Sequence, residues 1–223
     1  MTSDPSSQQP LSNTGDASDL TQQNQVEASF PIVGIAASAG GLEAFIQLLG
    51  HLSTDTGMAF VLIQHLSPEY ESLLSEILAR STPLPVREVQ NGMKVEPNQV
   101  YVIPPNTQMT ISDDTLQLSP RKKVAGKYMP GDAFFTSLAA ARGHKAIGVV
   151  LSGLDGDGSV GLKVIKAAGG VTFAQCEDTA KFDSMPSTAV ATGNVDFVLP
   201  PTLIAEELVN LSRNPMLVRP LPP

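Results

Sequence analysis

Short apolar runs alternate with segments of helical periodicity between residues 30 and 212. The strand-like runs occupy residues 32–37, 58–64, 86–89, 100–104, 146–152, 171–175 and 196–200. Apolar residues recur at helical spacing in residues 42–52, 69–81, 132–143, 159–169, 184–193 and 203–212. Continuous apolar strands that alternate with amphipathic helices predict a doubly wound α/β domain, with a mostly parallel sheet covered by helices on both faces.

Two segments between residues 108 and 131 interrupt this alternation. Residues 108–119 alternate with period two around Asp113-Asp114, which predicts an antiparallel β-hairpin inserted in the domain or added at its edge. Residues 123–131 are expected to form a loop. The basic cluster Arg121-Lys122-Lys123 is likewise expected to lie in a solvated loop.

The two ends of the chain differ in composition from the segment between them. Residues 1–29 are rich in Ser, Thr, Gln and Asp and are predicted to be a disordered tail. Residues 213–223 are proline-rich and are predicted to be a linker or a frayed end. The folded domain is therefore expected to span residues 30–212.

Composition and charge exclude several classes of protein. No apolar run approaches the length of a membrane span, and the N-terminus lacks a signal-peptide pattern. The single cysteine, Cys176, cannot form an internal disulfide, which fits a cytoplasmic location. The net charge of −8 argues against a nucleic-acid surface.

A serine, a histidine and an aspartate each follow a predicted parallel strand. Ser38 comes after residues 32–37, His65 after residues 58–64, and Asp155 and Asp157 after residues 146–152. Ligands of open α/β sheets bind at the carboxyl ends of the strands, so these side chains are expected at one edge. This set of groups is the one used for nucleophilic acyl transfer.

The turn after residue 37 favours such a role for Ser38. A strand-to-helix turn projects the hydroxyl, and Gly40 and Gly41 leave the main chain open to a substrate oxyanion. Taken singly, Ser38 could instead be a helix N-cap and His65 a structural histidine.

The sequence Gly156-Asp157-Gly158-Ser159-Val160-Gly161 matches a dinucleotide-binding pattern and is the main competing interpretation. Asp155 and Asp157 would repel a pyrophosphate there, and no Lys or Arg between residues 146 and 162 would offset them. An EF-hand is also disfavoured, because Lys166 stands where the bidentate glutamate would be. No metal site is predicted.

Six segments together resemble the catalytic domain of the CheB-type chemotaxis protein-glutamate methylesterases. They read AASAGGLEAF, VLIQHLSPEYESLL, VYVIPPN, GDAFFTSLA, IGVVLSGLDGDGSVGLKVIKAAGG and FDSMPSTAVATG. The resemblance implies hydrolysis of glutamyl methyl esters on the cytoplasmic helices of chemoreceptors, with receptor glutamine deamidation as a second activity. It implies no cofactor.

Carried over residue by residue, the resemblance makes Ser38 the nucleophile, His65 the general base and Asp157 the carboxylate. It places Ala39, Gly40, Gly41 and Leu154 in the oxyanion and substrate loops. Ala39 stands where members often have threonine, and Leu154 where many have methionine.

Stand-alone members carry a receiver domain, for which 29 residues are too few. The segments GLEAF and FDSMPSTAVATG resemble the module that is fused ahead of a receptor methyltransferase domain. Besides the chemoreceptor, a receptor methyltransferase is therefore an expected partner, either fused or separate. The alternative function is a non-catalytic or dinucleotide-binding regulatory module of a signalling protein.

Overall fold

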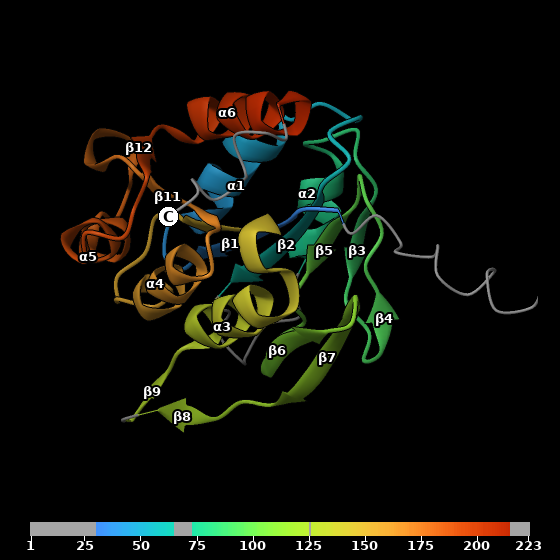
Figure 1. The fold of residues 1–223 in the computed structure, drawn as a ribbon, viewed down its shortest axis with the longest axis horizontal. Helices are drawn as coiled ribbons and strands as arrows, with labels where there is room; N and C mark the ends of the chain where they lie inside the picture. The colour runs from blue at the N-terminus through green and yellow to red at the C-terminus, as the bar shows by residue number, and fades with distance from the viewer. Residues whose placement is uncertain (1–29, 65–72, 125, 215–223) are drawn as a thin grey trace, which may run out of the picture.

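The computed structural model describes residues 30–64, 73–124 and 126–214. The predicted base His65, the predicted tail 1–29 and all but the first two residues of the predicted linker 213–223 lie outside these residues. Figure 1 shows a central sheet with helices packed on both sides and a smaller antiparallel element below it.

Seven strands form the central sheet in the order β12-β11-β10-β1-β2-β5-β3. In chain order they are β1 (Ile32–Ala37), β2 (Ala59–Gln64), β3 (Val86–Glu88), β5 (Val100–Val102), β10 (Ala146–Val150), β11 (Val171–Gln175) and β12 (Phe197–Leu199). Every neighbouring pair of these strands is parallel, as the apolar runs predict.

Six α-helices accompany the strands in the described residues. They are α1 (Gly41–Leu49), α2 (Leu74–Ala79), α3 (Pro130–Arg142), α4 (Ser159–Ala167), α5 (Ser184–Ala191) and α6 (Pro201–Arg213). Two 3₁₀ turns occupy Gly143–Lys145 and Glu177–Thr179. No described helix is long and apolar enough to cross a membrane.

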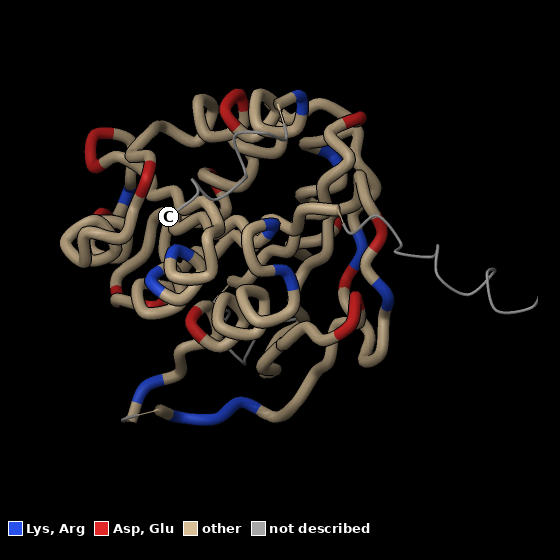
Figure 2. The backbone as a smooth tube through the Cα atoms, viewed as in Figure 1, with Lys and Arg blue, Asp and Glu red and all other residues tan. Residues whose placement is uncertain are grey.

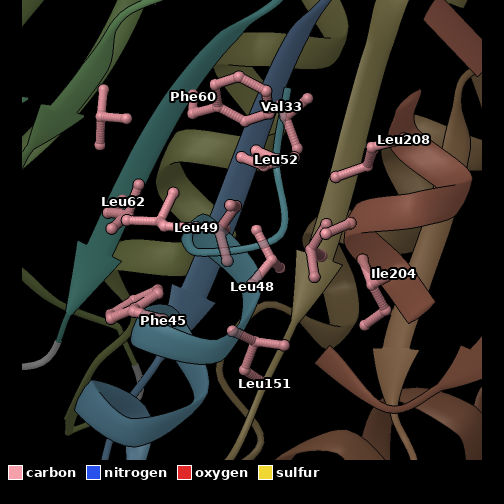
Figure 3. Packing of buried hydrophobic residues seen from close by; sticks show 14 of the residues in the cluster. Val33, Phe45, Leu48, Leu49, Leu52, Phe60, Leu62, Leu151, Ile204 and Leu208 are labelled. Atoms are coloured by element: carbon pink, nitrogen blue, oxygen red, sulfur yellow. The ribbon is translucent and has the colours of Figure 1, made fainter. Parts of the chain in front are cut away.

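The two faces of the sheet carry separate cores because side chains alternate along each strand. Val33 and Ile35 of β1 lie on the face of the sheet that α1, α2 and α6 cover. Ile32 and Ala36 lie on the face that α3, α4 and α5 cover. Figure 3 shows the first core, where apolar side chains of α1 gather with those of β1 and β2, and where Ile204 and Leu208 of α6 lie on the side of Leu151, the residue after β10.

The chain leaves β1 towards β2 and leaves β10 towards β11, so the winding reverses between β1 and β10. Helix α1 covers one face on the first path and α4 covers the opposite face on the second. Such a switch point opens a crevice at the carboxyl edge, which is where open α/β sheets bind ligands.

The predicted hairpin is present as β6 (Thr107–Ser112) and β7 (Thr115–Pro120). Asp113 and Asp114 both adopt positive φ, as a two-residue hairpin turn requires. The hairpin belongs to a separate three-stranded sheet with β4 (Met93–Lys94), and this third strand was not predicted.

The predicted loop 123–131 is wrong in detail. It contains a second small hairpin, β8 (Lys123–Val124) and β9 (Lys127–Tyr128), and its last two residues already belong to α3. Two strands of two residues each carry too little periodicity for a sequence pattern to detect. The helix starts earlier than predicted because proline, here Pro130, is tolerated in the first turn of a helix.

Candidate functional site

Ser38 lies directly after β1 at the switch point. Its N–H donates to the carbonyl oxygen of Ser152 at 3.0 Å, and its own carbonyl oxygen accepts the N–H of Gly41 at 3.0 Å. Gly40, with φ 75°, is the N-cap residue of α1, so Ser38 is not the cap. The N–H of Gly41 is already hydrogen-bonded within the turn. Of the three residues of this loop that were assigned to the oxyanion and substrate loops, Ala39 and Gly40 therefore remain the candidate N–H donors to an oxyanion.

Ser152 fastens this turn to a second loop. Its hydroxyl donates to the carbonyl oxygen of Ala39 at 2.8 Å and accepts the N–H of Phe182 at 3.0 Å. The N–H of Ser152 donates to the Gln175 side chain at 2.9 Å. A Cβ at Gly40 would lie 2.7 Å from the Ser152 hydroxyl, so the left-handed turn and this close approach both require glycine.

A cleft of about 450 Å³ opens in front of Ser38. Its walls include Leu42 and Glu43 of α1, Gln64 at the end of β2, and Lys181. Glu43 and Lys181 form an exposed ion pair at 3.4 Å. The buried Oε1 of Gln64 has no hydrogen-bond partner among the described residues.

The last residue of β2 lies beside the turn that carries Ser38. Gln64 is paired with Ala37, the residue that precedes Ser38. The main chain therefore passes the Ser38 turn immediately before His65. The imidazole itself lies outside the described residues.

Asp157 is buried, with 4% of its surface exposed, and its carboxylate is held by the N-terminus of α3. Oδ2 accepts the N–H of Gly131 at 2.8 Å and Oδ1 accepts the N–H of Asp132 at 2.9 Å. Burial raises the pKa of Asp157 to about 6; the two amides oppose this shift, and the nearby charges of Asp132 and Asp155 add to it.

Asp155 has the local role expected from its place in the loop. Its Oδ1 accepts the N–H of Asp157 at 3.1 Å. The bond shapes the turn before α4, so Asp155 supports the position of Asp157.

Asp132 is a site residue that the sequence pattern did not indicate. Its Oδ1 accepts the N–H of Gly161 in the first turn of α4 at 2.8 Å. Burial raises its pKa, whereas hydrogen bonds from the backbone of Gly161, Val160 and Gly158 lower it. Asp157, which precedes α4, thus binds the start of α3, and Asp132 of α3 binds the start of α4. These reciprocal hydrogen bonds join the two helices.

The glycine pattern at residues 156–161 serves this packing. A Cβ at Gly161 would lie 2.5 Å from Cβ of Phe135 on α3, so glycine allows α3 and α4 to approach closely. The start of α4 already binds the carboxylate of Asp132, which removes the basis for a phosphate site there.

The second predicted loop also lies beside Ser38. A Cβ at Gly153 would be 3.1 Å from Cβ of Ser38, and the N–H of Gly153 donates to the carbonyl oxygen of Phe182 at 2.9 Å. The side chain of Leu154 is 62% exposed. Ser38, Asp157 and the loop before Leu154 are therefore gathered at one edge.

Comparisons with known proteins agree with this arrangement. The CheB methylesterase family model matches residues 33–208. The chain is 34% identical over 200 residues to the protein-glutamate methylesterase/protein-glutamine glutaminase of group 3 operon of Rhizobium meliloti (strain 1021), covering 89% of this chain and 56% of that protein. An uncharacterised 104.1 kDa protein of Rhodobacter capsulatus is 44% identical over 126 residues, which are 56% of this chain and 13% of that protein.

Among solved structures, the chain resembles the crystal structure of the Thermotoga maritima CheB methylesterase catalytic domain. The TM-score is 0.76 at 28% identity, over 82% of this chain and 99% of that one. The chain spans about half the length of the curated methylesterases it matches. Fold, site and similarity agree: the chain belongs to the CheB methylesterase family.

Proposed function

We propose that residues 30–212 form a catalytic domain that hydrolyses glutamyl methyl esters of a chemoreceptor, with Ser38, His65 and Asp157 as its triad. The observation that carries the proposal is the position of Ser38 at the switch point, beside the loop that leads to a buried carboxylate. Names of relatives that include protein-glutamate methylesterase support the substrate class.

In this mechanism the Ser38 hydroxyl oxygen attacks the ester carbonyl carbon and its proton passes to His65. The carbon–oxygen bond to the methoxy group then breaks, and methanol leaves with the proton from His65. Water then attacks the carbonyl carbon of the acyl-serine while His65 takes its proton. The bond to the Ser38 oxygen breaks, this oxygen takes the proton from His65, and glutamate is released. Ionised Asp157 holds the imidazole and stabilises its cation, and the amides of Ala39 and Leu154 are the proposed oxyanion donors.

The same acyl chemistry accepts a glutamine side chain, with ammonia as the leaving group in place of methanol. The relatives named protein-glutamine glutaminase support this second activity. The match within a 104.1 kDa protein supports the proposal that a domain of this kind operates inside a larger polypeptide, for which a receptor methyltransferase is the proposed fused or separate partner.

Ser38→Ala tests the proposal directly. Methanol release from a methylated receptor fragment and hydrolysis of p-nitrophenyl acetate are expected to fall by roughly 10⁴-fold or more, with an unchanged circular dichroism spectrum. The matched control is Ser112→Ala, which removes an exposed hydroxyl on β6 and is expected to leave both activities unchanged. Undiminished methanol release from folded Ser38→Ala protein would exclude the hydrolase mechanism.

A further inference from the structure

The segment between the two antiparallel hairpins concentrates positive charge in an acidic chain. Arg121, Lys122, Lys123 and Lys127 lie within seven positions, and no Asp or Glu occurs between residues 115 and 131. The whole chain has 14 Lys and Arg residues and a net charge of −8. This segment is therefore a local exception to the charge of the molecule.

Lys123 lies in β8 and Lys127 in β9, and Arg121 and Lys122 directly precede β8. We call residues 121–124 and 126–128 the basic arm. Figure 1 shows β8 and β9 extending away from the body of the molecule beneath α3, and Figure 2 shows Lys and Arg along the arm without acidic residues among them. Lys122, Lys123 and Lys127 are exposed.

Tyr128 organises the positive charges of the arm. The Arg121 guanidinium carbon lies 4.4 Å from the centre of the Tyr128 ring, and the Lys123 ammonium lies 5.4 Å from it. Cations at these distances are attracted to the ring face. The arm consequently presents its charges on a defined scaffold, and it does not offer the Tyr128 face for stacking against a nucleic-acid base.

The arm is connected to the candidate site through a few residues of main chain. Strand β9 ends at Tyr128, and α3 begins at Pro130. The next two amides, of Gly131 and Asp132, are those that bind Asp157. The base of the arm therefore lies at the same edge of the sheet as the candidate carboxylate.

We propose that the basic arm docks an acidic segment of the protein substrate next to the ester that Ser38 cleaves. This inference rests on the function proposed above. Hydrolysis converts a neutral ester into a carboxylate, so a substrate with several glutamyl esters becomes more acidic with each turnover. A basic arm on an otherwise acidic domain attracts and orients such a substrate, and the charge of the remaining surface disfavours other orientations.

The test compares two synthetic peptides that carry one glutamate γ-methyl ester each, one flanked by glutamates and one by glutamines. The variant is Lys122→Gln/Lys127→Gln, which leaves the two cations beside Tyr128 in place. The matched control is Lys94→Gln/Lys163→Gln, which removes the same charge from exposed positions on β4 and α4. Hydrolysis of p-nitrophenyl acetate measures the chemistry without docking.

We expect the arm variant to raise KM for the glutamate-flanked peptide by roughly threefold to tenfold. Its activity on the glutamine-flanked peptide and on p-nitrophenyl acetate should equal that of the parent. Raising NaCl from about 50 to about 300 mM should raise KM for the acidic peptide in the parent more than in the arm variant. An unchanged KM, or an equal increase in the control variant, would overturn the proposal.

Binding measurements separate this inference from the proposed function. Fluorescence anisotropy with a labelled glutamate-flanked peptide that carries norleucine in place of the ester, a side chain that neither proposed activity can cleave, tests the arm even if the parent hydrolyses no ester. Parent binding that the arm variant weakens supports docking. Equal binding by both, or stronger binding of the parent to vesicles of equal parts phosphatidylcholine and phosphatidylglycerol than to the peptide, contradicts it.

Discussion

Main-chain amides, rather than side chains, hold the Asp157 carboxylate in its position. A carboxylate can accept both N–H groups, whereas the amide of asparagine accepts one and directs its own N–H₂ at the other. The proposed triad also needs a negative charge beside the imidazolium. These two demands make residue 157 more sensitive to amide substitution than its neighbour Asp155.

Asp157→Asn is therefore expected to lower kcat for ester hydrolysis by roughly 10²- to 10⁴-fold with little change in KM. Asp155→Asn is expected to stay within about tenfold of the parent, because the asparagine oxygen can still accept the N–H of residue 157. Steady-state kinetics on p-nitrophenyl acetate compare the two. Greater damage from Asp155→Asn would require a different carboxylate in the triad.

Asp132→Asn distinguishes the effect of the Asp132 charge on Asp157 from the role of Asp132 in joining α3 to α4. The asparagine oxygen can keep the bond to the N–H of Gly161, while the negative charge that raises the pKa of Asp157 is removed. The pKa of Asp157 should therefore fall, and the acid limb of the kcat/KM profile should move to lower pH. The control is Glu206→Gln, which removes the same charge from an exposed position on α6. An acid limb that stays in place in Asp132→Asn would show that Asp132 acts only as a helix link.

Sequence reasoning identifies residues whose function depends on their place in the chain, and it misses those that act through the tertiary structure. Ser38 and Asp157 follow strands, so their common edge could be predicted. Asp132 appears in the sequence as an acidic residue in the first turn of its own helix, but its partner is the helix 29 residues later. Ser152 and Lys181 likewise reach the site through contacts that no local pattern encodes.

At the scale of elements, long periodic segments could be predicted and short ones could not. The strands β1, β2, β10 and β11 lie where the apolar runs place them, because two buried faces demand continuous apolar sequence. The helical spacing of residues 69–81 predicts one apolar face made of Tyr70, Leu73, Leu74, Ile77 and Leu78, and this face is only partly correct. Leu74 and Leu78 are buried, but Leu73 is 60% exposed and Ile77 36%. Tyr70 of that face lies outside the described residues.

The contact between α3 and α4 provides a prediction about an element. Gly161→Ala would place a methyl group against Phe135 and is expected to cost about 1 to 3 kcal/mol of unfolding free energy. Separation of the helices should also weaken the hydrogen bonds that Asp132 and Asp157 accept from the opposite helix, so kcat should fall. Urea denaturation and esterase kinetics measure both effects. Lys163→Ala on the exposed side of the same helix should change neither by much, and equal effects of the two variants would contradict this packing role.

At the scale of the whole molecule, the buried Asp157 makes stability depend on pH. An aspartate in an unfolded chain has a pKa of about 3.9, whereas that of Asp157 is raised to about 6. The folded state therefore binds more protons between these values. The contribution of Asp157 to stability is complete below about pH 4 and is lost as the pH rises through about 6.

The difference between the parent and Asp157→Asn isolates this contribution from other titrating groups. Between about pH 4 and pH 7, the parent should lose about 2 to 3 kcal/mol more unfolding free energy than the variant does. Urea denaturation at several pH values provides the measurement. Parallel pH profiles for the two proteins would mean that residue 157 keeps an ordinary pKa in the fold.

The seam between β1 and β10 also divides the site between two halves of the chain. Ser38 and Gln64 come from the strands on one side of the seam, and Asp157 follows β10 on the other. A chain cut between β8 and β9 would yield two fragments, neither of which contains the whole site. Ester hydrolysis would then report the reassembly of the sheet, so the fold is suited to fragment complementation, with β1 and β10 meeting at the joint.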